Sequence, residues 1–392
     1  MPGTTFPLAT YIDTADDLQR LADELAGEPL LAVDTESNSL HAYQERVCLI
    51  QLSTRRADYI VDPLQIPNLD PLAPLMASPD VQKIFHAAEY DIMCMKRDFG
   101  FEFCNLFDTM TAARVCGFKS VGLGSLLQEY AGIRLDKKHQ LDNWGQRPLP
   151  ASSLKYAQAD THYLPMLRDE FMKQLQQMGR LEEAREVFEE ICRLDAASYR
   201  EFDPDGFWRI GLPNMLNTQE LQILRELYRL REDIAQEEDR PPFRVLSNNM
   251  LIGIARNAPA SARQLRDVRE VGGRHVRHYG DRILSAVQRG LAAKSLPERP
   301  QPPLPDPVIS ERYTALHTWR KSRANQRGVE SDIIISKQAL WDMAHQPPTC
   351  LDELRAVPGV GPWRLRTYGQ EILAVLRDFE RVDEYNGHHP RR

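Results

Sequence analysis

The stretch LLAVDTESNS, from Leu30 to Ser39, is the most informative segment for the fold of the first part of the chain. Its apolar, branched beginning favours a buried strand at Leu30–Glu36, which ends with Asp34 and Glu36. Side chains alternate along a strand, so these two acids lie on the same face. Neighbouring carboxylates repel each other, and a cation would relieve that repulsion. A solvated strand end or a nearby helix cap is the alternative interpretation.

Short segments rich in β-branched and aromatic residues surround this strand and predict further strands. They are Arg46–Thr54, Ala57–Pro63, Lys83–Ala88 and Asn105–Thr109. Helical stretches precede and separate them, and Thr14 with Asp17 forms a capping pair at the start of the first helix. This alternation predicts an α/β domain in which helices cover a sheet.

Two more acids make a cation site plausible. Asp91 lies in FHAAEYD, near the start of a predicted helix, and Asp160 lies in YAQAD within another helical stretch. Tyr156 precedes Asp160 by one helical turn and therefore shares its face. Together with Asp34 and Glu36 these residues would form a site made only of oxygen ligands. Such a site suits Mg²⁺ or Mn²⁺ better than zinc.

The segments VDTE, FHAAEYD and YAQAD resemble, in order, the three motifs of the DEDD exonuclease superfamily, in its tyrosine variant. The resemblance extends over residues 30–167, and LDKKHQLDNWGQRPLP (135–150) is similar to the ribonuclease D family and its exosome relatives. It implies a ribonuclease H-like α/β exonuclease domain with a mixed sheet. DKKHQ is closer to the exosome-type enzymes than to the usual bacterial form, which leaves the RNA substrate open.

The resemblance also implies roles for the five site residues. Asp34 would bridge two divalent ions, Mg²⁺ or Mn²⁺. Glu36 and Asp160 would complete one ion site, and Asp91 would hold the other ion. Tyr156 would orient the attacking water, because an unperturbed tyrosine with a pKa near 10 is a poor general base. The predicted catalytic residues are therefore these four acids and this tyrosine.

The C-terminal half contains a duplication. Leu265–Leu284 matches Leu354–Leu373, and equivalent residues such as Tyr279 and Tyr368 are 89 residues apart without a gap. Each copy is long enough for four or five short helices, which predicts two small all-α domains. Both copies resemble the HRDC domain, and an exonuclease domain followed by two such domains is the ribonuclease D arrangement.

These patterns predict the boundaries of five segments. The exonuclease domain with a helical connector is expected at residues 1–200, and the two HRDC-like domains at 208–292 and 309–380. A proline-rich linker at 293–308 separates the two domains, since its composition disfavours both helix and sheet. The last segment, 381–392, is expected to be a polar tail.

Nucleic-acid binding must depend on local charge, because the net charge of the 392-residue chain is −7. Seven arginines and two histidines lie between Arg256 and Arg282, against three acids. This segment predicts an RNA-binding face, with a solvated helix surface as the alternative. The candidate RNA contacts are Lys137, Lys138, Trp144, Arg147, Arg263, Arg266, Arg274 and Arg277.

Two further features allow two interpretations each. His86 either lies near the metal site or is a core histidine with satisfied hydrogen bonds. The GVG segment Gly359–Gly361 either binds a phosphate through backbone amides or forms a tight turn that needs glycine.

The function predicted from these residues is a metal-dependent 3′–5′ exoribonuclease that releases nucleoside 5′-monophosphates. Its substrate would be RNA with a free 3′ end, such as a tRNA precursor. A DNA exonuclease and a non-catalytic RNA-binding scaffold are the alternatives. The sequence contains no apolar run that could span a membrane, no signal-peptide pattern and no C-x-x-C pair among its six cysteines, so we expect a cytoplasmic protein.

Overall fold

The computed structural model describes residues 6–135, 138–299 and 306–386. Lys137, part of the predicted linker and the end of the predicted polar tail lie outside the described residues. The chain divides into two compact units. Unit 1 comprises Met1–Glu36, Val47–Ala197 and Leu304–Arg392, and unit 2 comprises Ser37–Arg46 and Ser198–Pro303.

A mixed sheet forms the centre of unit 1, as the resemblance to the exonuclease superfamily implies. It has six strands, because one further strand joins the five that the sequence predicts. The strands are β1 (Thr10–Ile12), β2 (Leu30–Ser37), β3 (Val47–Ser53), β4 (Asp58–Val61), β5 (Gln82–Phe85) and β6 (Leu106–Asp108). Their order is β1-β4-β3-β2-β5-β6. β3 and β4 pair antiparallel, whereas β1 with β4, β2 with β5, and β5 with β6 pair parallel.

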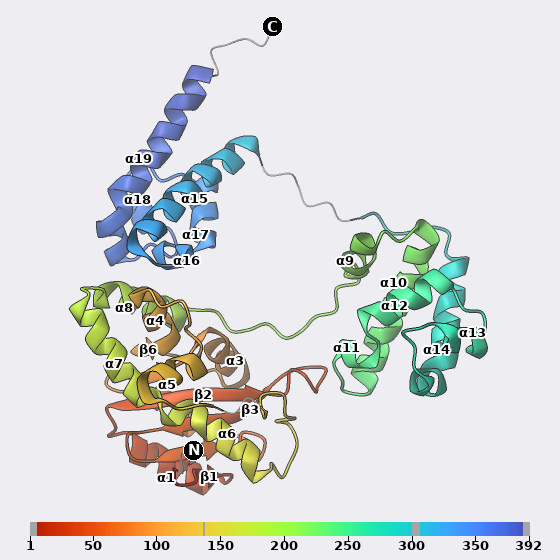
Figure 1. Ribbon diagram of the computed structural model, residues 1–392, viewed down its shortest axis with the longest axis horizontal. Coiled ribbons are helices and arrows are strands. Elements are labelled where there is room, and N and C mark those ends of the chain that lie inside the picture. Colours follow the sequence, from red (N-terminus) through yellow and green to blue (C-terminus); the bar gives the residue numbers. More distant parts are fainter. Residues whose placement is uncertain (1–5, 136–137, 300–305, 387–392) are drawn as a thin grey trace. The chain divides into compact units, whose positions relative to one another are not determined.

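Helices cover this sheet, with α1 drawn below β2 and with α7 and α8 drawn above it in Figure 1. Their bounds are α1 (Ala15–Leu25), η1 (Asp70–Leu72), α2 (Ala73–Ala77), α3 (Glu89–Phe99), α4 (Thr109–Cys116), α5 (Leu123–Ala131), α6 (Ala151–His162), α7 (Leu164–Gln177) and α8 (Leu181–Cys192). The predicted cap is present, since the Thr14 side chain accepts a hydrogen bond from the amide of Asp17 at 3.2 Å.

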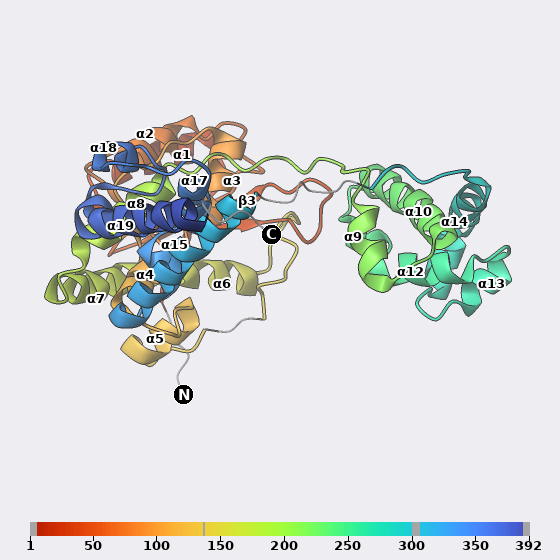
Figure 2. The ribbon, with the colours of Figure 1, turned by 90° about the horizontal axis from the view of Figure 1, so that it is seen from above.

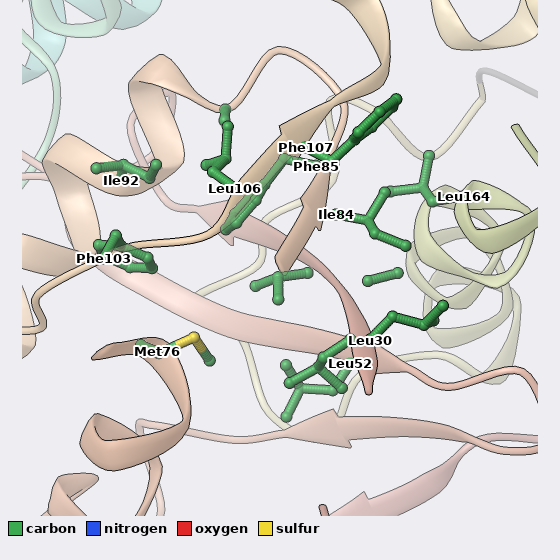
Figure 3. Close-up of a cluster of buried hydrophobic side chains, with 14 of the residues drawn as sticks. Leu30, Leu52, Met76, Ile84, Phe85, Ile92, Phe103, Leu106, Phe107 and Leu164 are labelled. Atoms are coloured by element: carbon green, nitrogen blue, oxygen red, sulfur yellow. The ribbon is translucent and has the colours of Figure 1, made fainter. Parts of the chain in front are cut away.

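The main hydrophobic core lies between the sheet and these helices (Figure 3). Ile84 of β5 and Phe107 of β6 contribute to it from the strands, and Leu164 from α7. β2 pairs with β5 over Leu30–Ala32, and its remaining residues continue past the paired part. The buried half of β2 is therefore fixed in register by the core, and its polar half extends at the carboxyl end of the sheet.

Unit 2 consists mainly of helices and contains the first copy of the repeat. The helices are α9 (Phe207–Gly211), η2 (Leu212–Asn214), α10 (Thr218–Glu237), α11 (Pro242–Val245), α12 (Asn248–Asn257), α13 (Ala262–Asp267) and α14 (Gly273–Ala292). We call α10–α14 module 1. Unit 2 also includes the loop Ser37–Arg46, whose Tyr43 donates a hydrogen bond to Glu232 of α10. Arg200 binds the same carboxylate with bonds of 2.6 and 2.7 Å.

The second copy of the repeat belongs to unit 1. It consists of α15 (Pro307–Arg327), α16 (Ser331–Ile334), α17 (Lys337–His345), α18 (Leu351–Arg355) and α19 (Pro362–Asn386), which we call module 2. The two copies share a hydrogen bond between a buried arginine and a backbone carbonyl. Arg231 donates to the carbonyl of Leu246 at 3.3 Å, and Arg320 donates to the carbonyl of Ile335 at 3.1 Å. Within the described ranges, no helix is both long and apolar enough to cross a membrane.

Candidate active site

The polar end of β2 brings two of the predicted acids to the edge of the core. Asp34 and Glu36 are half-buried and follow the fully buried run Leu31–Val33. Asp160 reaches the same place from α6, and one carboxylate oxygen from each of the three acids lies within 4.8 Å of the others. The structure therefore brings these three acids together.

Asp91 lies beside this group rather than within it. It is buried near the start of α3 and accepts a hydrogen bond from the Thr35 hydroxyl, between the two acids of β2. Its charge nevertheless acts on Asp34 and Glu36. All four predicted acids therefore share one electrostatic environment.

Burial raises the pKa of each of these acids, and nearby negative charges raise it further. The pKa of Asp34 is raised well above its usual range by burial, and then by the charges of Asp91 and Asp160. The pKa of Glu36 rises to about 9, and those of Asp91 and Asp160 rise to about 7, with burial as the largest cause in each case. An oxygen-only donor set in which negative charge is disfavoured fits a divalent cation, which would stabilise the ionised carboxylates.

Tyr156 lies one turn before Asp160 on α6 and donates a hydrogen bond to its carboxylate. Burial and the surrounding acids raise the pKa of Tyr156 far above its usual value. The hydroxyl therefore keeps its proton at neutral pH and acts as a donor, which agrees with a positioning role and argues against a general base.

A cavity of about 250 Å³ opens onto these groups. Asp34, Tyr156 and Asp160 line it, and His86 lines it from the segment after β5. The His86 Nδ1 lies 2.9 Å from the Thr109 hydroxyl, which itself donates to the carbonyl of Phe85. His86 is therefore both satisfied by a hydrogen bond and adjacent to the site, so its two interpretations are not exclusive.

Asp108 is a supporting residue that the sequence analysis did not identify. It is fully buried at the end of β6 and accepts hydrogen bonds from the amides of Ala88 at 2.7 Å and Thr111 at 2.6 Å. The first bond fixes the turn that enters α3, where Ala87 has a positive φ of 67°. Asp108 thereby positions the helix that carries Asp91. Its place directly before the Thr109 helix start is an N-cap signal that could have suggested part of this role.

A second set of bonds fixes α6 to the sheet. Gln158, which is 2% exposed, accepts from the amide of Ala9 and donates to Asp58 at 2.7 Å. The Ser53 hydroxyl donates to the Thr161 hydroxyl at 2.7 Å. These bonds flank Asp160 on both sides along the helix, so they determine where its carboxylate lies.

Two of the expected RNA contacts are corrected by the structure. Trp144 is 2% exposed and packs with its ring centroid 6.2 Å from that of Tyr156, so the ring is not accessible for stacking on a base. Arg147 is engaged inside the domain, with bonds of 2.6 and 2.7 Å to Asp62 and one of 2.8 Å to the carbonyl of Cys48. Trp144 packs beside Tyr156, and Arg147 holds the Trp144 segment by donating to its carbonyl at 2.7 Å.

The other basic candidates lie on the surface. Lys138 is exposed, and so are the four arginines expected to contact RNA, two on α13 and two on α14. The four are Arg263, Arg266, Arg274 and Arg277. The structure therefore leaves their guanidinium groups on the outside of module 1.

Comparisons with known proteins agree with this geometry. A 3′–5′ exonuclease family model matches residues 9–176, and an HRDC domain model matches residues 220–287 and 310–376. Ribonuclease D of Gluconacetobacter diazotrophicus is 32% identical over 383 residues, which cover 94% of this chain and 93% of that protein. Exosome complex exonuclease RRP6 of Saccharomyces cerevisiae is 31% identical over 297 residues, 72% of this chain and 40% of that protein.

A solved structure shows the same fold over most of the chain. The crystal structure of Escherichia coli RNase D, described as an exoribonuclease involved in structured RNA processing, matches with a TM-score of 0.62 and 24% identity. The match covers 94% of this chain and 99% of that one. With the near-complete match to the Gluconacetobacter protein, these findings show that the chain belongs to the ribonuclease D family and is a 3′–5′ exoribonuclease.

Proposed function

We propose that Asp34, Glu36, Asp91 and Asp160 hold two divalent ions, Mg²⁺ or Mn²⁺, and that these acids with Tyr156 are the catalytic residues. The observation that carries the proposal is the group of three carboxylate oxygens within 4.8 Å of one another. Bound ions of this kind stabilise the attacking and leaving oxygens of a phosphodiester displacement and lower the pKa of a water.

Within this proposal the protein groups bind and orient. Tyr156 uses its retained proton to orient the attacking water towards the scissile phosphate. Asp108 and Gln158 keep α3 and α6 in place, so that the acids converge without a change of shape when RNA binds. Preorganised ligands of this kind avoid a reorganisation cost during the reaction.

We propose structured RNA with a free 3′ end, such as a tRNA precursor, as the substrate, with release of nucleoside 5′-monophosphates. The description of the Escherichia coli relative supports this class. The exposed arginines of module 1, and Lys138 near the active site, would contact its phosphates. We also propose the five segments expected from the sequence: the exonuclease domain with its connector at 1–200, the two HRDC-like domains at 208–292 and 309–380, the linker at 293–308 and the polar tail at 381–392. We propose action in the reducing cytoplasm, which fits six cysteines that form no disulfide in the described part of the chain.

The experiment compares 3′-labelled RNA and DNA of one sequence with Mg²⁺, with Mn²⁺ and with chelator. We expect RNA to shorten from its 3′ end with either metal, and no cleavage in chelator. Equal cleavage of DNA would favour the alternative of a DNA exonuclease. Cleavage in chelator would contradict the metal assignment.

Metal binding should also be visible without turnover. A ligand at 100 times its Kd stabilises the folded state by about 2.7 kcal/mol, so Mg²⁺ or Mn²⁺ should raise the Tm of the exonuclease domain by several degrees. Asp34→Asn should remove both this shift and the activity. Asp70→Asn, at an exposed acid outside the site, should keep both. A full metal-dependent shift in Asp34→Asn would contradict the ligand assignment.

A further inference from the structure

Gln51 carries a buried amide group to which none of the contacts described above assigns a role. The residue lies in the middle of β3 and is fully buried. Neither its amide nitrogen nor its amide oxygen has a hydrogen-bond partner within the described part of the chain. Burying an amide without hydrogen bonds is costly, so such groups are rare in folded proteins and require an explanation.

Gln158 shows how the same domain uses a buried glutamine to hold its elements together. Its oxygen accepts from the amide of Ala9 at 3.1 Å, and its nitrogen donates to Asp58 at 2.7 Å and to the carbonyl of Pro7 at 2.6 Å. Both polar atoms of that side chain are therefore satisfied by the protein. A purely structural role explains Gln158, but it does not explain the amide of Gln51.

The side chain of Gln51 faces α6, which packs on β3 (Figure 2). Ser53 lies two residues further along β3, and therefore on the same face, and it donates to Thr161 of α6. Ile60, which is paired with Gln51 across β4, belongs to the same hydrophobic cluster as Ala157 of α6. Gln51 therefore lies under the turn of α6 that carries one of the proposed metal ligands.

The register of the sheet also places Gln51 beside Asp34. β3 is the neighbour of β2, and the amide of Asn38, just after β2, donates to the carbonyl of Arg46, just before β3, at 3.3 Å. This bond closes the loop between the two strands. Asp34 lies four residues before Asn38, and Gln51 lies five residues after Arg46, so the two lie at the same level to within one residue. The amide and the carboxylates thus share the face of the sheet beneath α6.

We infer that Gln51 is a positioning residue of the proposed metal site, whose amide forms its hydrogen bonds when a divalent ion is bound. Mg²⁺ keeps several waters in protein sites, and the carboxylates around it are ionised. A hydrating water and an ionised carboxylate together offer the donor and the acceptor that a carboxamide needs. Such outer contacts orient metal ligands and increase metal affinity. The inference rests on the metal site under the proposed function.

The first measurement compares the Tm of two variants of the full-length chain in chelator. Gln51→Met keeps an unbranched side chain of similar length without the amide, so its Tm should equal or exceed that of the parent. Gln158→Met, the matched control, should lower the Tm, because it leaves buried partners unsatisfied. Gln51→Leu serves as a second apolar variant.

The second measurement is a Mn²⁺ titration of the Tm, followed by the same titration of RNA cleavage. The Mn²⁺ concentration that gives half of the full effect should rise roughly 10- to 100-fold in Gln51→Met, as expected when a group that orients metal ligands is lost. The control Gln177→Met, at an exposed position of α7, should titrate like the parent.

Two results would overturn the inference and leave the proposed metal site in place. One is a parental Mn²⁺ titration in Gln51→Met. The other is a loss of Tm in chelator as large as that of Gln158→Met, since the amide would then be bonded without the ion. A parent chain whose Tm does not respond to Mn²⁺ would instead contradict the proposed function, and the inference with it.

Discussion

The surroundings of a side chain in this site determine its protonation state and therefore what it can do chemically. Tyr156 illustrates this, because burial and three nearby carboxylates hold its proton in place. A tyrosine that stays protonated can donate a hydrogen bond throughout the reaction but cannot remove a proton from water.

The first prediction at this scale concerns Tyr156→Phe, which removes only the hydroxyl. We expect the rate of RNA cleavage to fall by roughly 10²-fold, at the low end of what a positioned catalytic group contributes. Binding of RNA in chelator should stay within a factor of about two, because the ring still packs beside Trp144. Single-turnover kinetics with a binding curve measures both, and parental activity would exclude Tyr156 from the site.

The second prediction concerns Asp108→Ala, which frees the turn before α3 without touching the four acids. Loss of the groups that orient metal ligands costs roughly 10- to 100-fold in metal affinity, so the Mg²⁺ concentration for half-maximal activity should rise by that range. Saturating metal should restore much of the rate. Asp80→Ala, at an exposed acid before β5, is the matched control. An unchanged metal titration would show that Asp108 has no part in positioning Asp91.

Residue-level prediction succeeds where spacing along one element decides the outcome. Asp34 and Glu36 alternate on a strand, and Tyr156 and Asp160 are one helical turn apart, so local geometry already places each pair. The prediction for Trp144 is wrong, because its burial comes from packing against elements that are distant in the sequence.

At the scale of elements, α6 determines the geometry of the candidate site because it carries two of the five proposed catalytic residues. Its inner face is tied to β4 and to the N-terminal segment through Gln158, whose amide also donates to the carbonyl of Pro7 at 2.6 Å. A shift of this helix would move Tyr156 and Asp160 together.

The third prediction follows for Gln158→Leu, which is similar in size but cannot make these hydrogen bonds. Leaving buried partners unsatisfied costs roughly 1–3 kcal/mol each in the worst case, so the free energy of unfolding should fall by about 2–4 kcal/mol. Urea unfolding checks this, and the exposed Gln177→Leu should stay within about 0.5 kcal/mol. Equal stability of the two variants would contradict the role given to Gln158.

Sequence patterns predict elements well when these are long or strongly patterned. The segment Arg46–Thr54 contains β3, and Leu30–Glu36 differs from β2 by one residue. β1 escapes prediction because three residues are too short for a pattern, and it exists through parallel pairing of Thr10 with Tyr59 and Ile12 with Val61. Such a strand depends on its neighbour rather than on its own sequence.

At the scale of the whole molecule, charge is distributed unevenly rather than in excess. The chain has 56 acidic against 49 basic residues, yet exposed arginines gather on α13 and α14. Local fields of this kind act over about a Debye length, roughly 8 Å at physiological salt, so under our proposal they would guide RNA despite the net negative charge.

The fourth prediction tests that surface with Arg274→Glu, Arg277→Glu in the full-length chain. Binding of a folded tRNA-like RNA should weaken, and the salt slope should fall by roughly one unit for each phosphate that the variant no longer neutralises. Cleavage of a short single-stranded oligonucleotide should not change, because the active site holds only a few nucleotides. Arg20→Glu, Arg56→Glu removes the same charge from exposed positions on unit 1 as a control. Equal effects of the two variants would mean that module 1 has no special role in RNA binding.

The 89-residue register of the duplication has a consequence for recombination within the gene. Ser247 and Ser336 cap equivalent helices by accepting from the amides of Met250 and Ala339, so unequal crossing-over between the copies would leave one hybrid module with matching caps. A hybrid joined after α12 would, however, carry Glu238 where Arg327 now faces Glu183. We expect the hybrid module of such a shortened chain to fold. Glu238 would, however, repel Glu183 of α8, so the hybrid module would dock poorly on that helix. This effect would select against loss of either copy.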